Sequence, residues 1–214
     1  MTISFPAGLA RLDLRIQWGR LVARDKLGGS WESEDADPYW TGSLTTSKLT
    51  DARLQDWEAF AAGAIAARSV IAFVDPVFRL PLAYRASGLP GDWDGTGEVE
   101  ALDDPSAPVV SGLPVGVTLK RGDRLNLVDG TARSYHMLRA DVTVASDTAQ
   151  ALPIVPYALP NAFSAGAGVS FADPSVGLHI VANSWTAPRV ARQLTVATAS
   201  LEEAATVPPA DEEL

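Results

Sequence analysis

The sequence predicts a mainly β protein of the α+β class with one long helix, and three observations support this. Runs in which apolar and polar residues alternate recur along the chain, as expected of strands with one buried face. Only residues 51–68 combine a helix-start signal with apolar residues at helical spacing. The 17 glycines and 15 prolines punctuate the runs and leave few other places for long helices.

The first expected strand covers residues 12–18, Leu-Asp-Leu-Arg-Ile-Gln-Trp, and residues 21–23 continue it. Gly28, Gly29 and Ser30 then interrupt the chain, and the acidic stretch that ends at Trp40 is expected to be a loop. Residues 152–156 carry two prolines and therefore fit a sheet edge. Residues 119–127 are expected to make a turn at Gly122-Asp123 and then a strand. The remaining expected strands are residues 69–74, 80–84, 134–138, 141–145, 177–181 and 193–198.

The expected helix begins after Thr50, a residue type favoured at N-caps, and Asp51 suits the positive end of the helix dipole. Its alanine-rich side allows another element to approach closely, while Trp57 and Phe60 supply large anchors. We therefore expect the helix to pack flat on a sheet. The apolar positions at helical spacing are Leu54, Trp57, Ala61, Ala64 and Ile65.

One domain is expected over residues 1–201, because 214 residues suffice for a single core and 47% of them are hydrophobic. Residues 87–114 carry repeated Gly, Pro and Asp and are expected to form a long loop. Residues 202–214 form an acidic, proline-containing C-terminal tail. Cysteine is absent, which excludes disulfides and thiolate chemistry.

The net charge of −9 argues against nucleic-acid binding, because such proteins usually present a basic stripe. No stretch approaches the roughly 20 apolar residues of a membrane-spanning helix. The first ten residues lack the basic and apolar regions of a signal peptide. We therefore expect a soluble protein that is made in the cytoplasm and has neither specific nucleic-acid binding nor a membrane span.

No catalytic, cofactor-binding or metal-ligating residue is assigned, and the chain is not expected to be an enzyme. The common nucleophile, zinc and phosphate-binding motifs are absent. His136 and His179 fall inside expected strands, without the spacing of a metal site, so both are interpreted as structural.

Two short patterns are weighed against simple structural roles. The acids between Asp92 and Asp104 could offer oxygen ligands to calcium, but they lack the ligand register of an EF-hand and are interpreted as a solvated loop. The triplet Arg121-Gly122-Asp123 matches an integrin-binding tripeptide, and it is interpreted as a turn between strands.

The six tryptophans divide into two expected groups. Trp18 and Trp57 are expected to anchor the core, since both fall in regular elements. The others lie in or near expected loops and are candidates for contacts between subunits, where tryptophan is enriched. This second group consists of Trp31, Trp40, Trp93 and Trp185.

The order of the expected elements resembles that of small tail proteins of long-tailed bacteriophages and phage-like particles, including distal tail and tail-tip components. The likeness covers residues 12–156 and is one of layout. It is carried by Leu54-Gln-Asp-Trp57-Glu-Ala-Phe60, by Phe73-Val-Asp-Pro76, and by residues 119–127 followed by 142–156.

The resemblance implies a β-sandwich or barrel-like core flanked by one α-helix. It also implies a homo-oligomeric ring, expected to be a hexamer, that connects the tail tube to the host-recognition apparatus of a virion. Partners would then be further copies and other tail proteins such as tube and hub or tip proteins, with synthesis in the bacterial host cytoplasm. The family has no catalytic residues to transfer, and an acidic surface would suit a channel through which DNA passes without binding.

Two other classes of function stay open at this point. A β-sandwich glycan-binding module would cluster aromatic residues on one shallow face, for which Trp31, Trp40 and Trp93 are the candidates. A metal- or carboxylate-dependent hydrolase would draw on the acids of residues 92–104.

Overall fold

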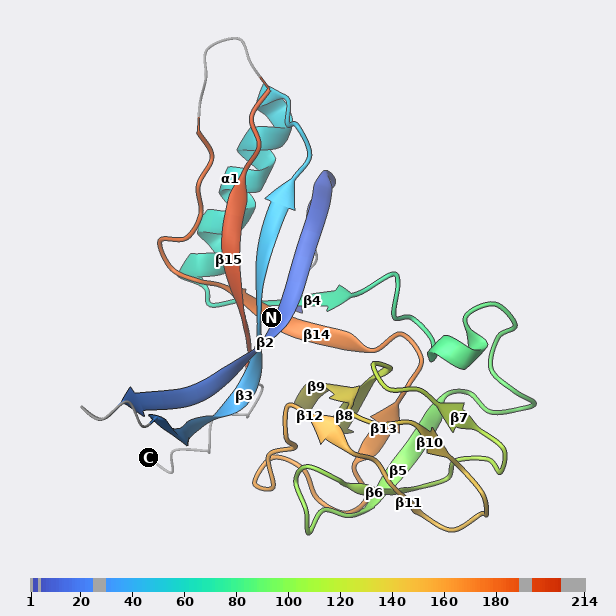
Figure 1. Ribbon diagram of the computed structural model, residues 1–214. Coiled ribbons are helices and arrows are strands. Elements are labelled where there is room, and N and C mark those ends of the chain that lie inside the picture. The colour runs from blue at the N-terminus through green and yellow to red at the C-terminus, as the bar shows by residue number, and fades with distance from the viewer. Residues whose placement is uncertain (1, 4, 25–29, 189–193, 205–214) are drawn as a thin grey trace, which may run out of the picture. The chain divides into compact units, whose positions relative to one another are not determined.

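The computed structural model describes residues 2–3, 5–24, 30–188 and 194–204, and of residues 2–3, 20–24 and 30–36 the backbone alone. The fold is mainly β with one α-helix, as predicted (Figure 1). The chain groups into two compact units. Unit 1 comprises residues 1–72 and 178–204, and unit 2 contains residues 73–177. These units divide the range 1–201 that was expected to be one domain, and its folding as a single cooperative domain stays a prediction.

A six-stranded sheet that belongs mainly to unit 1 has the strand order β1-β4-β14-β15-β3-β2. Its longest members, β2 and β3, form an antiparallel hairpin, whereas β1 and β4 run parallel. The chain leaves unit 1 along β4 and returns along β14, its neighbour in the sheet. The strands are β1 (Thr2–Ile3), β2 (Leu9–Arg24), β3 (Ser30–Thr46), β4 (Val70–Val74), β14 (Ser175–Ile180) and β15 (Thr198–Glu203).

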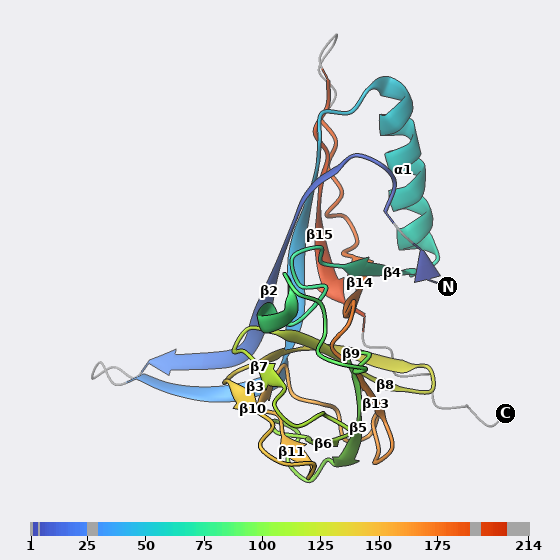
Figure 2. The ribbon, with the colours of Figure 1, turned by 90° about the vertical axis from the view of Figure 1, so that its right-hand side faces the viewer.

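Helix α1 (Asp51–Ala66) lies along one face of this sheet (Figure 2). Thr50 is its N-cap and Asp51 lies in its first turn, as predicted, although the Thr50 side chain makes no capping hydrogen bond. Its inward face consists of the expected residues Leu54, Trp57, Ala61 and Ala64. Buried apolar side chains on strands β3 and β15 of the same unit are Leu44, Ala199 and Leu201.

Trp57 is the centre of the aromatic packing in unit 1. Its ring is 0% exposed, and its indole Nε1 donates a hydrogen bond to the carbonyl oxygen of Ala7 over 3.0 Å. Trp185 stacks on it with ring centroids 6.1 Å apart, and Phe5 stacks at 6.1 Å. Phe60 of the same helix meets it edge-on at 5.7 Å. The helix is thereby attached to segments from both ends of the chain.

Unit 2 is built on a seven-stranded antiparallel sheet with the order β11-β6-β5-β13-β8-β9-β12, which curls into a half-barrel. A separate two-stranded sheet pairs β7 with β10, and a short 3₁₀ helix, η1 (Leu82–Tyr84), precedes the sheet strands. The strands are β5 (Thr96–Ala101), β6 (Val109–Ser111), β7 (Thr118–Leu119), β8 (Arg124–Asp129), β9 (Ala132–Leu138), β10 (Val142–Thr143), β11 (Gln150–Ala151), β12 (Ile154–Val155) and β13 (Gly168–Ser170).

The curled sheet encloses a core that is mainly aliphatic and also contains the aromatic residues Trp93, Phe163 and Phe171. Asn126 is a buried polar exception on β8. Its Nδ2 donates to the carbonyl oxygens of Ser134 and Ser175, both over 2.8 Å, and its Oδ1 accepts from the Ser175 amide over 2.6 Å. One amide side chain therefore ties β8 to its neighbour β9 and to the start of β14.

Four of the expected elements are wrong or displaced. Residues 87–114 contain β5 and β6 and are not one long loop. The acidic stretch up to Trp40 lies within β3, where pairing to β2 along its whole length holds it extended. Residues 80–84 form η1 rather than a strand, because Pro81 lacks an amide donor and its carbonyl instead closes a turn with the Tyr84 amide over 2.9 Å.

The last expected strand, residues 193–198, starts only at Thr198 and continues to Glu203 as β15. The first two residues of the expected acidic tail therefore belong to a strand, and residues 205–214 lie outside the described part of the chain. By contrast, β12 lies at an edge of its sheet, which confirms the edge position predicted from its prolines.

Candidate assembly interface

Strand β2 is an edge strand of the six-stranded sheet, and it is 16 residues long. Unpaired amide and carbonyl groups along such an edge form a template for another strand, and proteins usually shorten or cover such edges. Within the described residues, no strand pairs with the outer edge of β2. Its inner edge lies close to β3, where a Cβ added to Gly42 would lie 2.6 Å from the Asp13 carbonyl oxygen. Glycine at position 42 permits this close approach.

The outer part of β3 has a second edge without a strand partner among the described residues. Strand β15 pairs with β3 through residues 41–45, and for residues 30–39 of β3 the described part of the chain provides pairing on the β2 side alone. The hairpin thus continues past β15 as a two-stranded ribbon, which Figure 2 shows extending away from α1. Two-stranded ribbons are marginally stable in water unless a third element supports them.

Two aromatic residues mark the place where the ribbon leaves the sheet. Trp18 and Tyr39 are 37% and 38% exposed, which is high for large aromatic side chains. The β2–β3 register shifts twice here, across Trp18 between Gln17 and Gly19 and again between Gly19 and Arg20. Irregularities of this kind bend and twist a ribbon.

The two strands of the ribbon differ in the sign of their charge. Strand β2 contains four arginines and one aspartate, and β3 contains four acids and no basic residue. The backbone pairs Arg20 with Glu34 directly across the hairpin. This segregation of charge could have been read from the sequence as a sign of a hairpin, since Gly28 and Gly29 separate the basic and acidic segments. The arginines of β2 are Arg11, Arg15, Arg20 and Arg24, and the acids of β3 are Glu32, Glu34, Asp35 and Asp37.

Three of the six tryptophan predictions are wrong. Trp18, expected in the core, is partly exposed, whereas Trp40 and Trp93, expected on the surface, are 1% and 8% exposed. Trp40 lies where β15 joins β3, and its amide donates to the Glu203 carboxylate over 2.9 Å. Trp93 packs in the core of unit 2. The structure therefore does not provide the exposed aromatic face that a glycan-binding module would require of Trp40 and Trp93.

The other three tryptophans have different outcomes. Trp57 is a core anchor, as predicted. Trp185, expected to contact other subunits, is half-buried and stacks on Trp57 within unit 1. The side chain of Trp31 lies outside the described residues, although its backbone belongs to β3.

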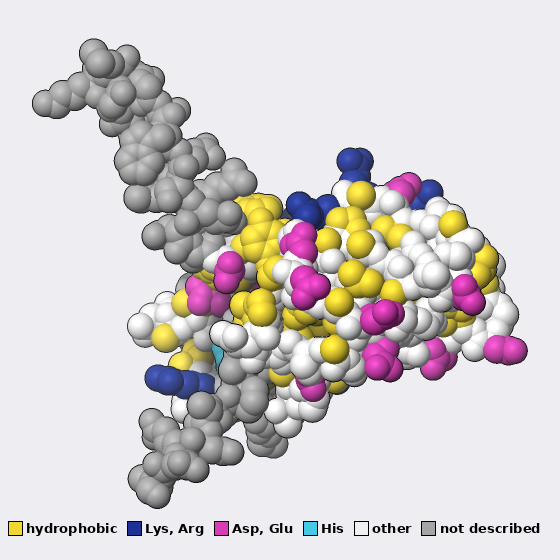
Figure 3. All heavy atoms as spheres, turned by 90° about the horizontal axis from the view of Figure 1, so that it is seen from below, with side chains coloured by type: hydrophobic (Ala, Val, Ile, Leu, Met, Phe, Trp, Pro, Cys, Tyr) yellow, Lys and Arg dark blue, Asp and Glu magenta, His cyan; other side chains and the backbone are white. Residues whose placement is uncertain are grey.

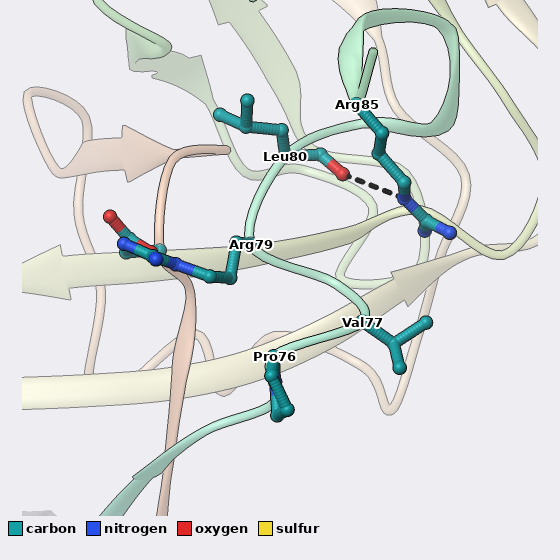
Figure 4. A pocket seen from close by; sticks show the side chains of 6 residues that line it. Pro76, Val77, Arg79, Leu80 and Arg85 are labelled. Atoms are coloured by element: carbon teal, nitrogen blue, oxygen red, sulfur yellow. Dashed lines mark hydrogen bonds and ion pairs between the residues drawn. The ribbon is translucent and has the colours of Figure 1, made fainter.

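Unit 2 has a surface hollow of about 430 Å³ beside the segment that follows β4 (Figure 4). The Arg79 guanidinium donates to the Asp173 carboxylate over 2.5 Å, and this bond lowers the pKa of Asp173. The Arg85 Nε donates to the Leu80 carbonyl oxygen over 3.2 Å. Both arginines thus have partners within the protein. The hollow is lined by Pro76, Val77, Arg79, Leu80, Arg85 and Asp173.

The acids of residues 92–104 act locally in turns. Asp94 accepts hydrogen bonds from the Thr96 amide over 2.9 Å and from its hydroxyl over 2.6 Å, which lowers the pKa of Asp94. Asp104 accepts from the Ser106 amide over 2.8 Å, and its pKa is lowered as well. In the part of the chain that the structure describes, no three His, Asp or Glu side chains come together as metal ligands would.

The Arg-Gly-Asp triplet forms a turn, as predicted. Gly122 has φ +95°, in the region that favours glycine. The Asp123 side chain is 1% exposed, and its carboxylate accepts from the amides of Leu82 and Lys120, each over 2.7 Å. A carboxylate held in this way ties η1 to the turn before β8 and is not displayed for a receptor.

Both histidines lie in strands, as predicted. The His179 Nδ1 lies 3.1 Å from the carbonyl oxygen of Ser69. His136 is 1% exposed, with its Nδ1 2.8 Å from the Pro156 carbonyl oxygen and its Nε2 2.5 Å from the Ser134 hydroxyl. Burial lowers the pKa of His136 to about 4.

The buried His136 predicts a loss of stability in mild acid. The unfolded chain takes up a proton near pH 6.5, whereas the folded protein keeps this imidazole neutral down to about pH 4. The contribution of the neutral His136 to the free energy of unfolding is therefore complete above pH 6.5 and is lost as the pH falls to 4. The total loss is about 3 kcal/mol. Urea unfolding at several pH values should show this slope in the wild type and a flatter one in His136→Gln. Equal slopes over this window would contradict the assignment.

On the face seen in Figure 3, acidic side chains are scattered singly, and the Lys and Arg side chains form no continuous stripe. No helix in the described ranges is long and apolar enough to cross a membrane. No protein-family model matches this chain, and it matches no curated protein. The resemblance to phage tail proteins thus stays a prediction from sequence layout.

Proposed function

We propose that the chain is a non-catalytic structural subunit of a phage-like tail, a ring-forming distal tail or tail-tip protein. About six copies would close into a ring that connects the tail tube to the host-recognition apparatus, within a virion assembled in a bacterial cytoplasm. The observation that carries this proposal is that two edges of the β2–β3 ribbon have no strand partner within the part of the chain that the structure describes. A ribbon of this length with two open edges is completed when neighbouring copies supply strands, and repetition of one contact around an axis gives a closed ring.

Two further observations support an assembly subunit over the other classes. Exposed Trp18 and Tyr39 accompany the ribbon, and aromatic residues are enriched at protein interfaces. The titratable groups with contacts described above serve turns, ion pairs or the core. One of these contacts joins a hydroxyl to an imidazole, Ser134 to His136, and this imidazole is buried at 1% exposure and also contacts the Pro156 carbonyl oxygen. These observations support a role in which strands pair between subunits over a role that depends on reactive side chains.

The oligomeric state of the purified chain tests the ring. Sedimentation and negative-stain imaging are expected to show closed rings with a mass near six times the 22.6 kDa of one copy. A protein that stays monomeric at high concentration would contradict the proposal.

The tail location needs a separate measurement. An antibody raised against the chain should label one end of the tail in particles released by cells that encode it. Labelling elsewhere on the particle, or none on intact and on detergent-opened particles alike, would reject the tail assignment even if rings form.

A further inference from the structure

We propose that neighbouring copies join head to tail through the ribbon, with the outer edge of β2 in one copy pairing with residues 30–39 of β3 in the next. This inference rests on the proposed function, because it names the contact by which the ring closes. Its occupant is a second copy of this chain. Both edges lack a strand partner within the described residues, and both belong to one hairpin.

The geometry of the hairpin allows this contact to repeat. Strands β2 and β3 are antiparallel, so two hairpins that lie side by side and point the same way also place β2 of one copy antiparallel to β3 of the other. A continuous antiparallel sheet results, with the strand order β3-β2-β3-β2. Each copy contacts one neighbour through the edge of β2 and the other neighbour through the edge of β3, so the contact is heterologous. Such a contact builds a ring when the rotation from one copy to the next adds up to a full turn.

The charges of the two strands select this arrangement over its alternatives. Strand β2 has a net charge of +3, from four arginines and one aspartate, and β3 has −4, from four acids. Pairing β2 with β2, or β3 with β3, would place like charges on adjacent strands, which is unfavourable. Head-to-tail pairing alternates the sign at every strand. The two symmetric dimers are thus disfavoured, and the ring-forming contact is favoured.

Pairing within the hairpin uses only one side of each strand. Arg20 faces Glu34 in the backbone register, so part of the charge segregation serves the hairpin itself. The outer side of β2 still meets an acidic strand in the proposed sheet, and the outer side of β3 meets a basic one. A useful experiment must therefore separate charge pairing inside one copy from charge pairing between copies.

Reversal of one strand tests for the contact. Arg20→Glu combined with Arg24→Glu makes β2 acidic, so the concentration for half-assembly should rise at least about tenfold. The matched control Arg53→Glu with Arg121→Glu changes the net charge equally at exposed positions of α1 and of the turn before β8, and it should assemble as the wild type does. Assembly is measured by analytical ultracentrifugation, and circular dichroism checks that each variant is folded.

Charge changes on both strands separate the two kinds of pairing. The quadruple variant Arg20→Glu, Arg24→Glu, Glu32→Arg and Glu34→Arg changes the net charge of β2 from +3 to −1 and that of β3 from −4 to 0, and it keeps opposite charges at the paired positions 20 and 34. It should form rings alone but be excluded from rings of wild-type chains, because a mixed ring must contain a contact in which the acidic β2 of the variant meets the acidic β3 of the wild type. Native mass spectrometry of a refolded mixture should find two homomeric species and few mixed ones.

The outcomes distinguish this contact from the ring itself. Random mixing of quadruple variant and wild type, or normal assembly of the Arg20→Glu/Arg24→Glu chain, would overturn the head-to-tail pairing and leave the ring intact. A folded quadruple variant that fails to assemble would also overturn it, since its edges remain complementary. A monomeric wild type would overturn both this inference and the proposed function.

Discussion

Trp57→Ala is expected to destabilise unit 1 by about 3 to 5 kcal/mol, among the largest effects of any single substitution in this chain. The side chain is fully buried, and its removal leaves a cavity between α1 and the segments that hold it. The Ala7 carbonyl oxygen also loses the indole donor. The midpoint of urea unfolding, followed by far-ultraviolet circular dichroism, should fall accordingly.

Trp57→Phe serves as the matched comparison for this substitution. It keeps most of the ring contacts with Phe5 and Trp185 but cannot donate to Ala7, so the expected loss is only about 1 to 2 kcal/mol. Equal midpoints for the alanine variant and the wild type would mean that the helix is not attached through this ring.

Asn126→Asp is expected to destabilise unit 2 by about 3 to 5 kcal/mol at neutral pH. The two side chains have nearly the same shape, but a carboxylate cannot donate to the carbonyl oxygens of Ser134 and Ser175. It would instead place a buried negative charge against both oxygens. The free energy of unfolding from urea titration measures the loss.

Asn161→Asp is the control for this second substitution. Asn161 is exposed, so the same chemical change should alter stability by no more than about 0.5 kcal/mol. If the two aspartate variants unfold at the same urea concentration, the hydrogen bonds of Asn126 do not hold β8 to β14 as described.

The sequence predicted the elements whose apolar pattern is carried by large side chains. The helix, β4, and the paired strands β8 and β9 each bury at least one leucine, isoleucine or tryptophan. Strands β5 and β6 escaped prediction because each has only one buried apolar side chain, which is too few to give an alternating pattern. Val99 and Val110 are 0% exposed, while Gly97 lies close to β6 and gives no apolar signal.

The ribbon could not be predicted for a different reason. Residues 31–37 of β3 are mostly acidic and show no alternation of apolar and polar residues, so their sequence does not indicate the extended backbone that pairing to β2 gives them. The predicted burial of Trp18 and exposure of Trp40 are the reverse of what the structure shows, because the extent of a neighbouring strand decides which residues are covered. Which residue of a strand lies under a neighbour depends on where β15 begins and ends, and local pattern does not contain that information.

The return of the chain along β14 beside β4 means that unit 2 is an insertion whose entry and exit strands are adjacent in one sheet. The insertion is therefore joined to the six-stranded sheet at two points that are only one strand spacing apart. Its length and sequence can change without altering the strand order on either side of that junction. We therefore expect that unit 2 could be replaced by another insertion while the strands of the six-stranded sheet keep their register.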